Sequence, residues 1–216
     1  PAFVPPELCR SVDRPPNGPG WGHEVKFDGY RLQLATGPSG QVIRTRKGLD
    51  WTSRFPEIAE AGRGLPDGTV LDGEAVALDH NGAPDFPALQ AALSDDATGD
   101  LIFFAFDLLF DEGRDLREEP LEARKAALKA RLEALGSERI RYVEHFETSG
   151  DAVLSSACRM SLEGVVSKRL DAPYRSGRSD AWTKAKCRAG HEVVIGGWTG
   201  EAGQLRSLLV GVQRER

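Results

Sequence analysis

The sequence predicts an α+β fold built from mainly antiparallel sheets. Runs of alternating apolar and polar residues, rich in β-branched and aromatic side chains, recur along the 216-residue chain. Helical periodicity is confined to a few segments, and no strand–helix–strand repeat runs through the chain. These observations favour strands that are joined by turns and flanked by occasional helices, and they argue against a parallel sheet.

Ten segments have the strand pattern. In chain order they are 23–27, 30–35, 41–46, 69–78, 101–110, 139–146, 164–170, 181–187, 192–198 and 207–212. The segment before them, residues 1–20, is rich in proline and glycine. That composition predicts an extended, loosely packed lead-in.

The clearest helix is predicted at 121–135. Leu121, Leu128 and Leu132 fall on one face at helical spacing, and Gly136 is a typical stop signal. Shorter helices are predicted at 54–62, 86–93 and 151–160.

Bulk composition indicates one ordinary globular domain. Apolar residues make up 40% and charged residues 28% of the chain. No apolar stretch approaches the roughly 20 residues that span a bilayer, and the first residues lack a signal-peptide pattern, so we expect a cytoplasmic protein without membrane contact. Cys9, Cys158 and Cys187 are odd in number and far apart, which predicts a reducing compartment and no disulfide framework.

The net charge of -5 argues against a chain that coats nucleic acid without specificity. A local basic surface is still compatible with it, because basic residues gather late in the chain. They are Lys168, Arg169, Arg175, Arg178, Lys184, Lys186 and Arg188. This asymmetry favours a cleft that faces phosphates, and a mixed surface without function is the alternative.

Lys26 is the most informative residue. It lies in the run EVKFDGYR at 24–31, inside an apolar strand pattern and directly before an Asp-Gly turn. Burial and neighbouring cations lower the pKa of a lysine, and only the neutral amine attacks an electrophile. The pattern therefore indicates a nucleophile, and an exposed lysine at the end of a strand is the alternative.

Four further segments follow Lys26 in order. They are RTRKGLD at 44–50, LDGE at 71–74, FAFDLL at 104–109, and the pair EGVVSK at 163–168 with WTKAK at 182–186. With the first run, these segments resemble the nucleotidyltransferase motifs of ATP-dependent DNA ligases, and most of all the ligase module of bacterial ligase D. The resemblance covers about residues 21–186 and implies two antiparallel sheets that enclose a nucleotide cleft.

The resemblance implies that Lys26 attacks the α-phosphate of ATP, forming a lysyl-AMP and releasing pyrophosphate. AMP would then pass to a 5′-phosphate at a DNA nick, and the adjacent 3′-hydroxyl would displace it. The expected cofactors are ATP and Mg²⁺ or Mn²⁺. The expected substrate is nicked or broken double-stranded DNA in bacterial end joining, close to the nucleoid, with an end-binding repair protein and fused primase or nuclease modules as candidate partners.

The resemblance also assigns site residues. The nucleotide-binding set is Glu24, Lys26, Arg31, Arg46, Glu74, Phe106, Lys168, Lys184 and Lys186. Carboxylates suit Mg²⁺, which makes Glu74 and Glu163 the metal candidates. Arg46 and Lys47 are the expected contacts to DNA.

Several of these positions have a purely structural alternative. Lys184 and Lys186 project to one face of a strand, where they could bind a triphosphate or guard a sheet edge. Arg31 could form a surface salt bridge, Phe106 could belong to the core, and Asp72 could be a turn residue.

The resemblance divides the chain into the lead-in 1–20, an adenylation domain at 21–190, and the start of an OB-fold domain at 191–216. The last segment is too short for a five-stranded barrel, so we expect an excised or minimal catalytic domain with a truncated OB fold. Other functions with the same lysine chemistry are an RNA ligase and a GTP-dependent capping nucleotidyltransferase. A nick-binding module without catalysis is the alternative from another class.

Overall fold

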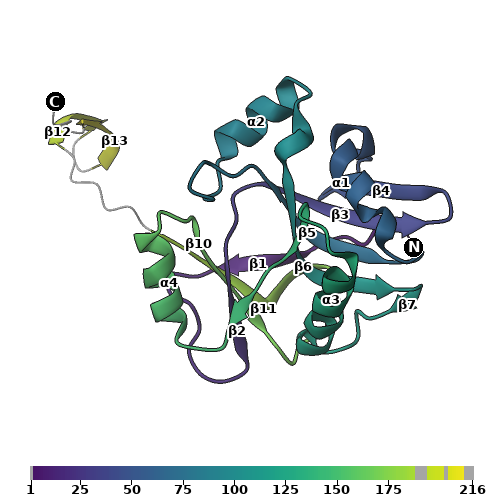
Figure 1. The fold of residues 1–216 in the computed structure, drawn as a ribbon. Helices are drawn as coiled ribbons and strands as arrows, with labels where there is room; N and C mark the ends of the chain where they lie inside the picture. Colours follow the sequence, from purple (N-terminus) through teal and green to yellow (C-terminus); the bar gives the residue numbers. More distant parts are fainter. Residues whose placement is uncertain (1, 188–193, 202–203, 212–216) are drawn as a thin grey trace.

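A computed structural model describes residues 2–187, 194–201 and 204–211. Two mainly antiparallel sheets pack together, with helices on their outer sides (Figure 1). The predicted α+β class is confirmed.

The first sheet has five strands and comes from distant parts of the chain. Its spatial order is β1 (Glu7–Ser11), β11 (Gly177–Lys186), β10 (Gly164–Arg169), β2 (Trp21–Val25) and β9 (His145–Phe146). β1 runs parallel to β11, and the other neighbours are antiparallel.

The second sheet has six strands and is more local in sequence. Its order is β4 (Gly40–Thr45), β3 (Tyr30–Gly37), β5 (Val70–Val76), β6 (Ile102–Asp111) and β7 (Arg114–Asp115), with β8 (Ile140–Tyr142) paired in parallel to β6. β5 is buried along nearly its whole length, which suits a central strand.

The segment predicted as one strand at 139–146 is divided between the two sheets. β8 pairs with β6 in the second sheet, whereas β9 pairs with β2 in the first. The prediction of a single strand was wrong because the chain crosses from one sheet to the other near Val143, whose amide donates to the carbonyl of Ala105 at 2.9 Å.

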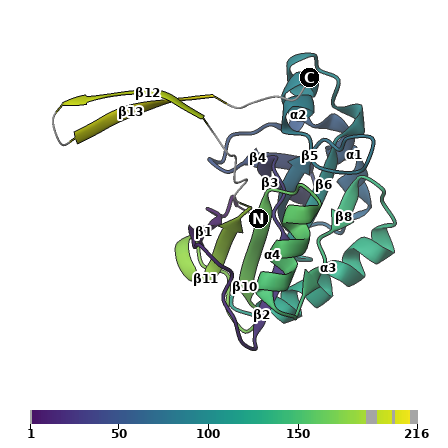
Figure 2. The ribbon, with the colours of Figure 1, turned by 90° about the vertical axis from the view of Figure 1, so that its left-hand side faces the viewer.

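The helices are α1 (Pro56–Ala61), α2 (Phe86–Ser94), α3 (Leu121–Leu135) and α4 (Gly150–Arg159), and each agrees with a predicted segment to within two residues. Three 3-10 turns, at Thr52–Arg54, Gly62–Gly64 and Thr98–Asp100, lie between strands. α3 packs on β6 and β8, and α4 packs on β10 and β2 (Figure 2). Gly136 ends α3 in the left-handed conformation with φ 62°, as its position predicts.

The lead-in is packed, which corrects the expectation of a loose segment. Val4 and Glu7 are buried, and β1 forms an edge of the first sheet. Glu7 accepts hydrogen bonds from the amide of Arg175 and the hydroxyl of Ser179. The strand was concealed because it is a five-residue run without proline inside a segment that is otherwise rich in proline and glycine.

The expectation that the cysteines form no disulfide framework was also wrong. Cys158 and Cys187 form a disulfide with a Cα–Cα distance of 5.3 Å, although 29 residues separate them. Antiparallel pairing of β10 with β11 places Gly164 opposite Lys186, so the end of β11 lies beside the segment that follows α4. Sequence spacing alone does not show this proximity.

Beyond β11, the described residues form a hairpin of β12 (Val194–Glu201) and β13 (Gln204–Gly211). It extends away from the two sheets in both ribbon views (Figures 1 and 2). Both strands agree with predicted segments, although positions 192, 193 and 212 lie outside the described residues. Within the described part of the chain, no helix is both long enough and apolar enough to cross a membrane.

Candidate active site between the two sheets

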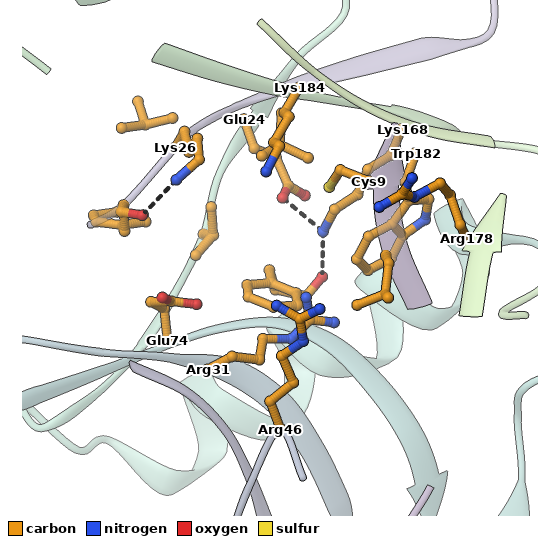
Figure 3. A pocket seen from close by; sticks show the side chains of 16 residues that line it. Cys9, Glu24, Lys26, Arg31, Arg46, Glu74, Lys168, Arg178, Trp182 and Lys184 are labelled. Carbon is orange, nitrogen blue, oxygen red and sulfur yellow. Dashed lines mark hydrogen bonds and ion pairs between the residues drawn. The ribbon is translucent and has the colours of Figure 1, made fainter. Parts of the chain in front are cut away.

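A cavity of about 340 Å³ lies between the sheets. Residues of β1, β2, β10 and β11 line it from the first sheet, and residues of β3, β5 and β6 line it from the second. Six cationic side chains lie along this lining, namely Lys26, Arg31, Arg46, Lys168, Arg178 and Lys184 (Figure 3). Such a concentration of positive charge suits a polyanionic ligand.

Strand register brings the cavity residues of the first sheet together. Val166 of β10 lies opposite both Glu24 of β2 and Lys184 of β11. Directly opposed residues project to the same face of a sheet, so these side chains form one row across three strands. In the next row, Lys168 lies opposite Trp182.

Lys26 follows β2 and has a fixed backbone. Its amide donates to the carbonyl of Gly164 at 2.9 Å, and its Nζ forms an ion pair with Glu163. A side chain at position 164 would come within 2.2 Å of the carbonyl oxygen of Ala185, and the residue has φ +152°, so glycine is required there. This close approach places Glu163 beside the lysine.

Gly29 has a similar role on the other side of Lys26. A Cβ at this position would lie 2.2 Å from the carbonyl oxygen of Ala75. The glycine therefore lets the segment after Lys26 approach the second sheet closely, as the Asp-Gly pattern predicts.

Glu163 is shared by two lysines. Its second oxygen accepts from Nζ of Lys186 at 2.8 Å. Burial alone would raise the pKa of the Glu163 carboxyl, but hydrogen bonds from Lys186 and Lys26 outweigh burial and lower it. The same contact raises the pKa of Lys186.

β11 is an interior strand, with β1 on one side and β10 on the other. This position excludes the sheet-edge alternative for Lys184, which lies opposite Ser11 of β1. Lys184 and Lys186 both line a second groove beside Arg10, and Lys184 lines the cavity as well. Lys184 and Lys186 thus continue the positively charged surface from the cavity into this groove.

The deepest charges in the cavity wall form a three-residue cluster. Glu24 accepts from Lys125 of α3 at 2.5 Å and from Lys168 at 2.7 Å, and all three side chains are at most 3% exposed. Burial would raise the pKa of Glu24, but the two lysines together lower it. Burial lowers the pKa of Lys168 against the attraction of Glu24.

Arg31 is anchored by Asp72. Its Nε and Nη2 both donate to the Asp72 carboxylate at 2.7 Å, and the Tyr174 hydroxyl donates to the same carboxylate at 2.6 Å. Asp72 is fully buried within β5, so its interpretation as a turn residue was wrong. With its side chain only 16% exposed, Arg31 is not part of a surface salt bridge either.

Phe106 of β6 lines the cavity but is 9% exposed. The guanidinium carbon of Arg31 lies 4.6 Å from the ring centroid, and Nζ of Lys168 lies 4.2 Å from it. The ring also belongs to a core cluster with Trp182 and Tyr174. Phe106 is therefore part of the core and also faces the cavity.

Glu74 projects from β5 toward the cavity (Figure 3). Burial raises the pKa of its carboxyl to about 7, and Asp72 and Glu163 add to this effect against the attraction of Arg31 and Lys26. Burial is the main cause of this shift, and a cation bound beside Glu74 would favour its ionised form. In the residues described, no group of three or more His, Cys, Asp or Glu side chains could hold a metal by itself. Mg²⁺ usually takes one or two carboxylates together with substrate phosphates, so Glu74 and Glu163 fit such an ion.

The two expected DNA contacts differ in position. Arg46 is exposed and lines the cavity. Lys47 is exposed in the turn after β4 and is not part of the cavity lining.

Several residues in the cavity lining, and one behind it, were not predicted as site residues. Arg178 and Trp182 are separated from Lys184 by an even number of residues, so they project to the same face of the strand. This alternation could have identified them as site residues. Lys125 occupies a position four residues after Leu121 and three before Leu128, so a charge on the apolar face of α3 was its signal. Cys9 had no signal, because it lies on the strand within the lead-in.

Comparison with known proteins places this geometry in a family. A profile described as "ATP dependent DNA ligase domain" matches residues 9–186. The multifunctional non-homologous end joining protein LigD of Pseudomonas aeruginosa is 41% identical over 216 residues, which cover 98% of this chain and 26% of that protein. The SPbeta prophage-derived DNA ligase-like protein LigB of Bacillus subtilis is 35% identical over 199 residues, or 91% of this chain and 72% of that one.

A solved structure supports the same relationship. The mycobacterial DNA ligase D complexed with ATP and MES superposes with a TM-score of 0.74 at 33% identity, covering 95% of this chain and 67% of that one. The chain spans about a quarter of the length of the Pseudomonas relative. Since the matched region runs from β1 to the last lysine of β11 and includes both walls of the cavity, the chain belongs to the family of ATP-dependent DNA ligase domains.

Proposed function

We propose that this chain is the adenylation domain of an ATP-dependent DNA ligase. In this proposal, Lys26 accepts AMP from ATP and the domain passes AMP to the 5′-phosphate of a DNA nick. The observation that carries it is the position of Lys26, whose partly exposed amine lies in a cavity walled by cations and is held by Glu163.

The first step forms one bond and breaks one bond. The lone pair of Nζ attacks the α-phosphorus, the bond to the bridging oxygen breaks, and pyrophosphate leaves with its electron pair. The attacking amine has to be neutral, so the proton that Nζ of Lys26 donates to Glu163 has to pass to that carboxylate before the attack. The pair with Glu163 then opens as the nucleotide binds. Lys184, which lines the cavity, would assist by holding the α-phosphate.

The other expected site residues have roles consistent with their positions. We assign Arg31 and Glu74 to the ribose and Phe106 to the adenine ring. Lys184 and Lys186 are assigned to nucleotide phosphates or to groups that hold them, and Lys168 is assigned to the nucleotide beside Glu24. Glu163 and Glu74 would hold Mg²⁺ or Mn²⁺, whose chemistry is to neutralise charge on the phosphates.

The DNA substrate and the partners rest on the relatives. The name of the Pseudomonas relative includes non-homologous end joining. We assign Arg46 and Lys47 to phosphates of a nicked duplex. We also propose that the chain acts at the nucleoid, together with an end-binding protein and with fused primase or nuclease modules. The β12–β13 hairpin would begin an OB-fold domain.

A two-stage ligation assay tests the proposal. Wild type should seal nicked DNA with ATP and Mg²⁺, whereas Lys26→Ala should fail with ATP but seal a nick that already carries 5′-AMP. Lys47→Ala, outside the cavity, should label with ATP at the wild-type rate and seal nicks more slowly. A Lys26→Ala variant that seals with ATP would contradict the assignment.

The same assay separates the other functions. Labelling from GTP in place of ATP would indicate a capping nucleotidyltransferase. Sealing that requires RNA on the 3′-hydroxyl strand would indicate an RNA ligase. Nick binding by wild type and Lys26→Ala alike, without any covalent nucleotide, would indicate a binding module.

A further inference from the structure

The buried cluster of Glu24, Lys125 and Lys168 contains a residue without a role in the proposed chemistry. Lys125 comes from α3, outside both sheets, and is 1% exposed. Its Nζ donates to Glu24 at 2.5 Å and to the carbonyl of Val143 at 2.8 Å. It also lies 4.7 Å from the ring centroid of Tyr142. The ammonium is thus held on several sides.

Lys125 does not line the cavity, whereas Glu24, Val143 and Lys168 do. The lysine therefore lies behind the cavity wall and contacts two of the groups that form it. A cation in this position cannot reach a ligand directly. It can act on a ligand through the carboxylate that it orients.

Each oxygen of Glu24 has one lysine partner, Oε1 with Lys125 and Oε2 with Lys168. A carboxylate oxygen has two acceptor positions, so acceptor capacity remains on Glu24 after both contacts. Lys168 Nζ has its Glu24 contact and a long 3.5 Å contact to the carbonyl of Phe106, and an ammonium has three donors. The wall therefore offers an anionic acceptor next to a cationic donor.

This pair has a chemical preference among purines. A 6-aminopurine presents an amino donor beside a ring-nitrogen acceptor, which complements a carboxylate next to an ammonium. A 6-oxopurine presents an oxygen acceptor beside an N–H donor, in the reverse order. Glu24 lies two residues before Lys26, about 7 Å away along an extended backbone, and both line the cavity, so both can contact one nucleotide.

We propose that Lys125 is a positioning residue for base selection: by fixing Glu24 from behind, it makes the site prefer a 6-amino over a 6-oxo purine nucleotide. This inference rests on the proposed function, because it assumes that the cavity holds the nucleotide that reacts with Lys26. The lowered pKa of Glu24 supports it, since the carboxylate stays an acceptor.

The test compares covalent labelling of the whole chain by ATP and by inosine triphosphate, which differ at position 6 of the purine. Rates are measured over a range of nucleotide concentrations to separate KM from kcat. Wild type should favour ATP by on the order of 10²-fold or more in kcat/KM, because a mismatched analogue leaves buried polar groups unpaired. Lys125→Met should reduce that preference by about tenfold or more, mainly through KM for ATP.

Lys129→Met is the matched control. Lys129 lies one turn further along α3, is 48% exposed and pairs with Glu144 at 2.8 Å. It should keep the wild-type preference. Lys125→Arg keeps a cationic donor and should restore most of it. If Lys125→Met does not fold, Lys125→Gln keeps a neutral donor and should show an intermediate loss.

The outcomes are separable. An unchanged preference in folded Lys125→Met or Lys125→Gln overturns the inference while the proposed function stands, as does a wild type that uses both nucleotides equally. An equal loss in Lys129→Met also overturns it, because the effect would then belong to α3 as a whole. A wild type that forms no adduct removes the proposed function and this inference together.

Discussion

The cavity has two ends whose charges are organised differently. At the closed end, Glu24 and Lys168 line the cavity and Lys125 lies behind them; these side chains are 1–3% exposed and every charge already has a partner. At the open end, Lys26 lines the cavity and pairs with Glu163, which also binds Lys186; their exposures are 18%, 20% and 60%. The closed end is built before any ligand arrives, whereas the open end can exchange its ion pairs for contacts with a ligand.

This difference predicts whether a substitution at each end lowers stability or activity. Breaking a buried ion pair leaves an uncompensated charge and destabilises the fold, while an exposed pair contributes little to stability. Closed-end substitutions should therefore lower stability, and open-end substitutions should lower activity. The following predictions are ordered by expected size.

The largest effect should come from Arg124, the neighbour of Lys125 on α3. Its guanidinium forms two hydrogen bonds to Asp107 at 2.8 and 2.9 Å, and both side chains are completely buried. Arg124→Met should lower the free energy of unfolding by about 3–5 kcal/mol in urea titrations. Arg131→Met, on the same helix with a 30% exposed side chain, should lose less than about 1 kcal/mol. Equal losses of unfolding free energy in the two variants would show that burial does not determine how much an ion pair on α3 contributes to stability.

Glu163→Gln tests the open end. The amide removes the negative charge that Lys26 and Lys186 share. We expect the rate of Lys26 labelling by ATP to fall on the order of 10²-fold, because the amide can neither take the proton of Lys26 nor help to hold Mg²⁺. The unfolding midpoint in urea should stay within about 1 kcal/mol of wild type. A stability loss as large as that of Arg124→Met would erase the distinction between the two ends.

Glu74 should give a smaller, pH-dependent effect. Its folded-state pKa is about 7 against an ordinary value of 4.5. Between these values the unfolded carboxyl has ionised while the folded one keeps its proton, so the stability of wild type should fall as pH rises through this window. Below pH 4.5 the Glu74 carboxyl is protonated in both the folded and the unfolded protein, so it no longer makes stability depend on pH. Allowing for partial exposure of the side chain, we expect a change of about 2 kcal/mol.

Glu74→Gln should lack this contribution. The difference in melting temperature between the variant and wild type should therefore grow in favour of the variant from pH 4.5 to 8. Parallel curves for the two proteins across that range would contradict the raised pKa.

Local patterns predicted most of the strands, and alternation located β3, β5 and β6. The motif around Lys26 singled out that lysine, although its partner Glu163 is 137 residues away. At the closed end, Glu24 and Lys168 were expected from the resemblance to ligases, whereas Lys125 was missed because its contacts are long-range. Lys125 and Glu24 are 101 residues apart and meet only after α3 packs beside β6 and β8.

The same reason accounts for the errors in β1 and the disulfide. Both depend on which strands neighbour β11, and periodicity contains no information about strand order. The roles of individual site residues were inferred from the resemblance to ligases and not from pattern.

The central claim is that the amine of Lys26 becomes bonded to AMP. Intact-mass measurement after incubation with ATP and Mg²⁺, followed by peptide mapping, tests this most directly. The account predicts an increment of one AMP, located on Lys26 and absent from Lys26→Ala. An unmodified wild-type chain at saturating nucleotide, or an adduct on another residue, would contradict it.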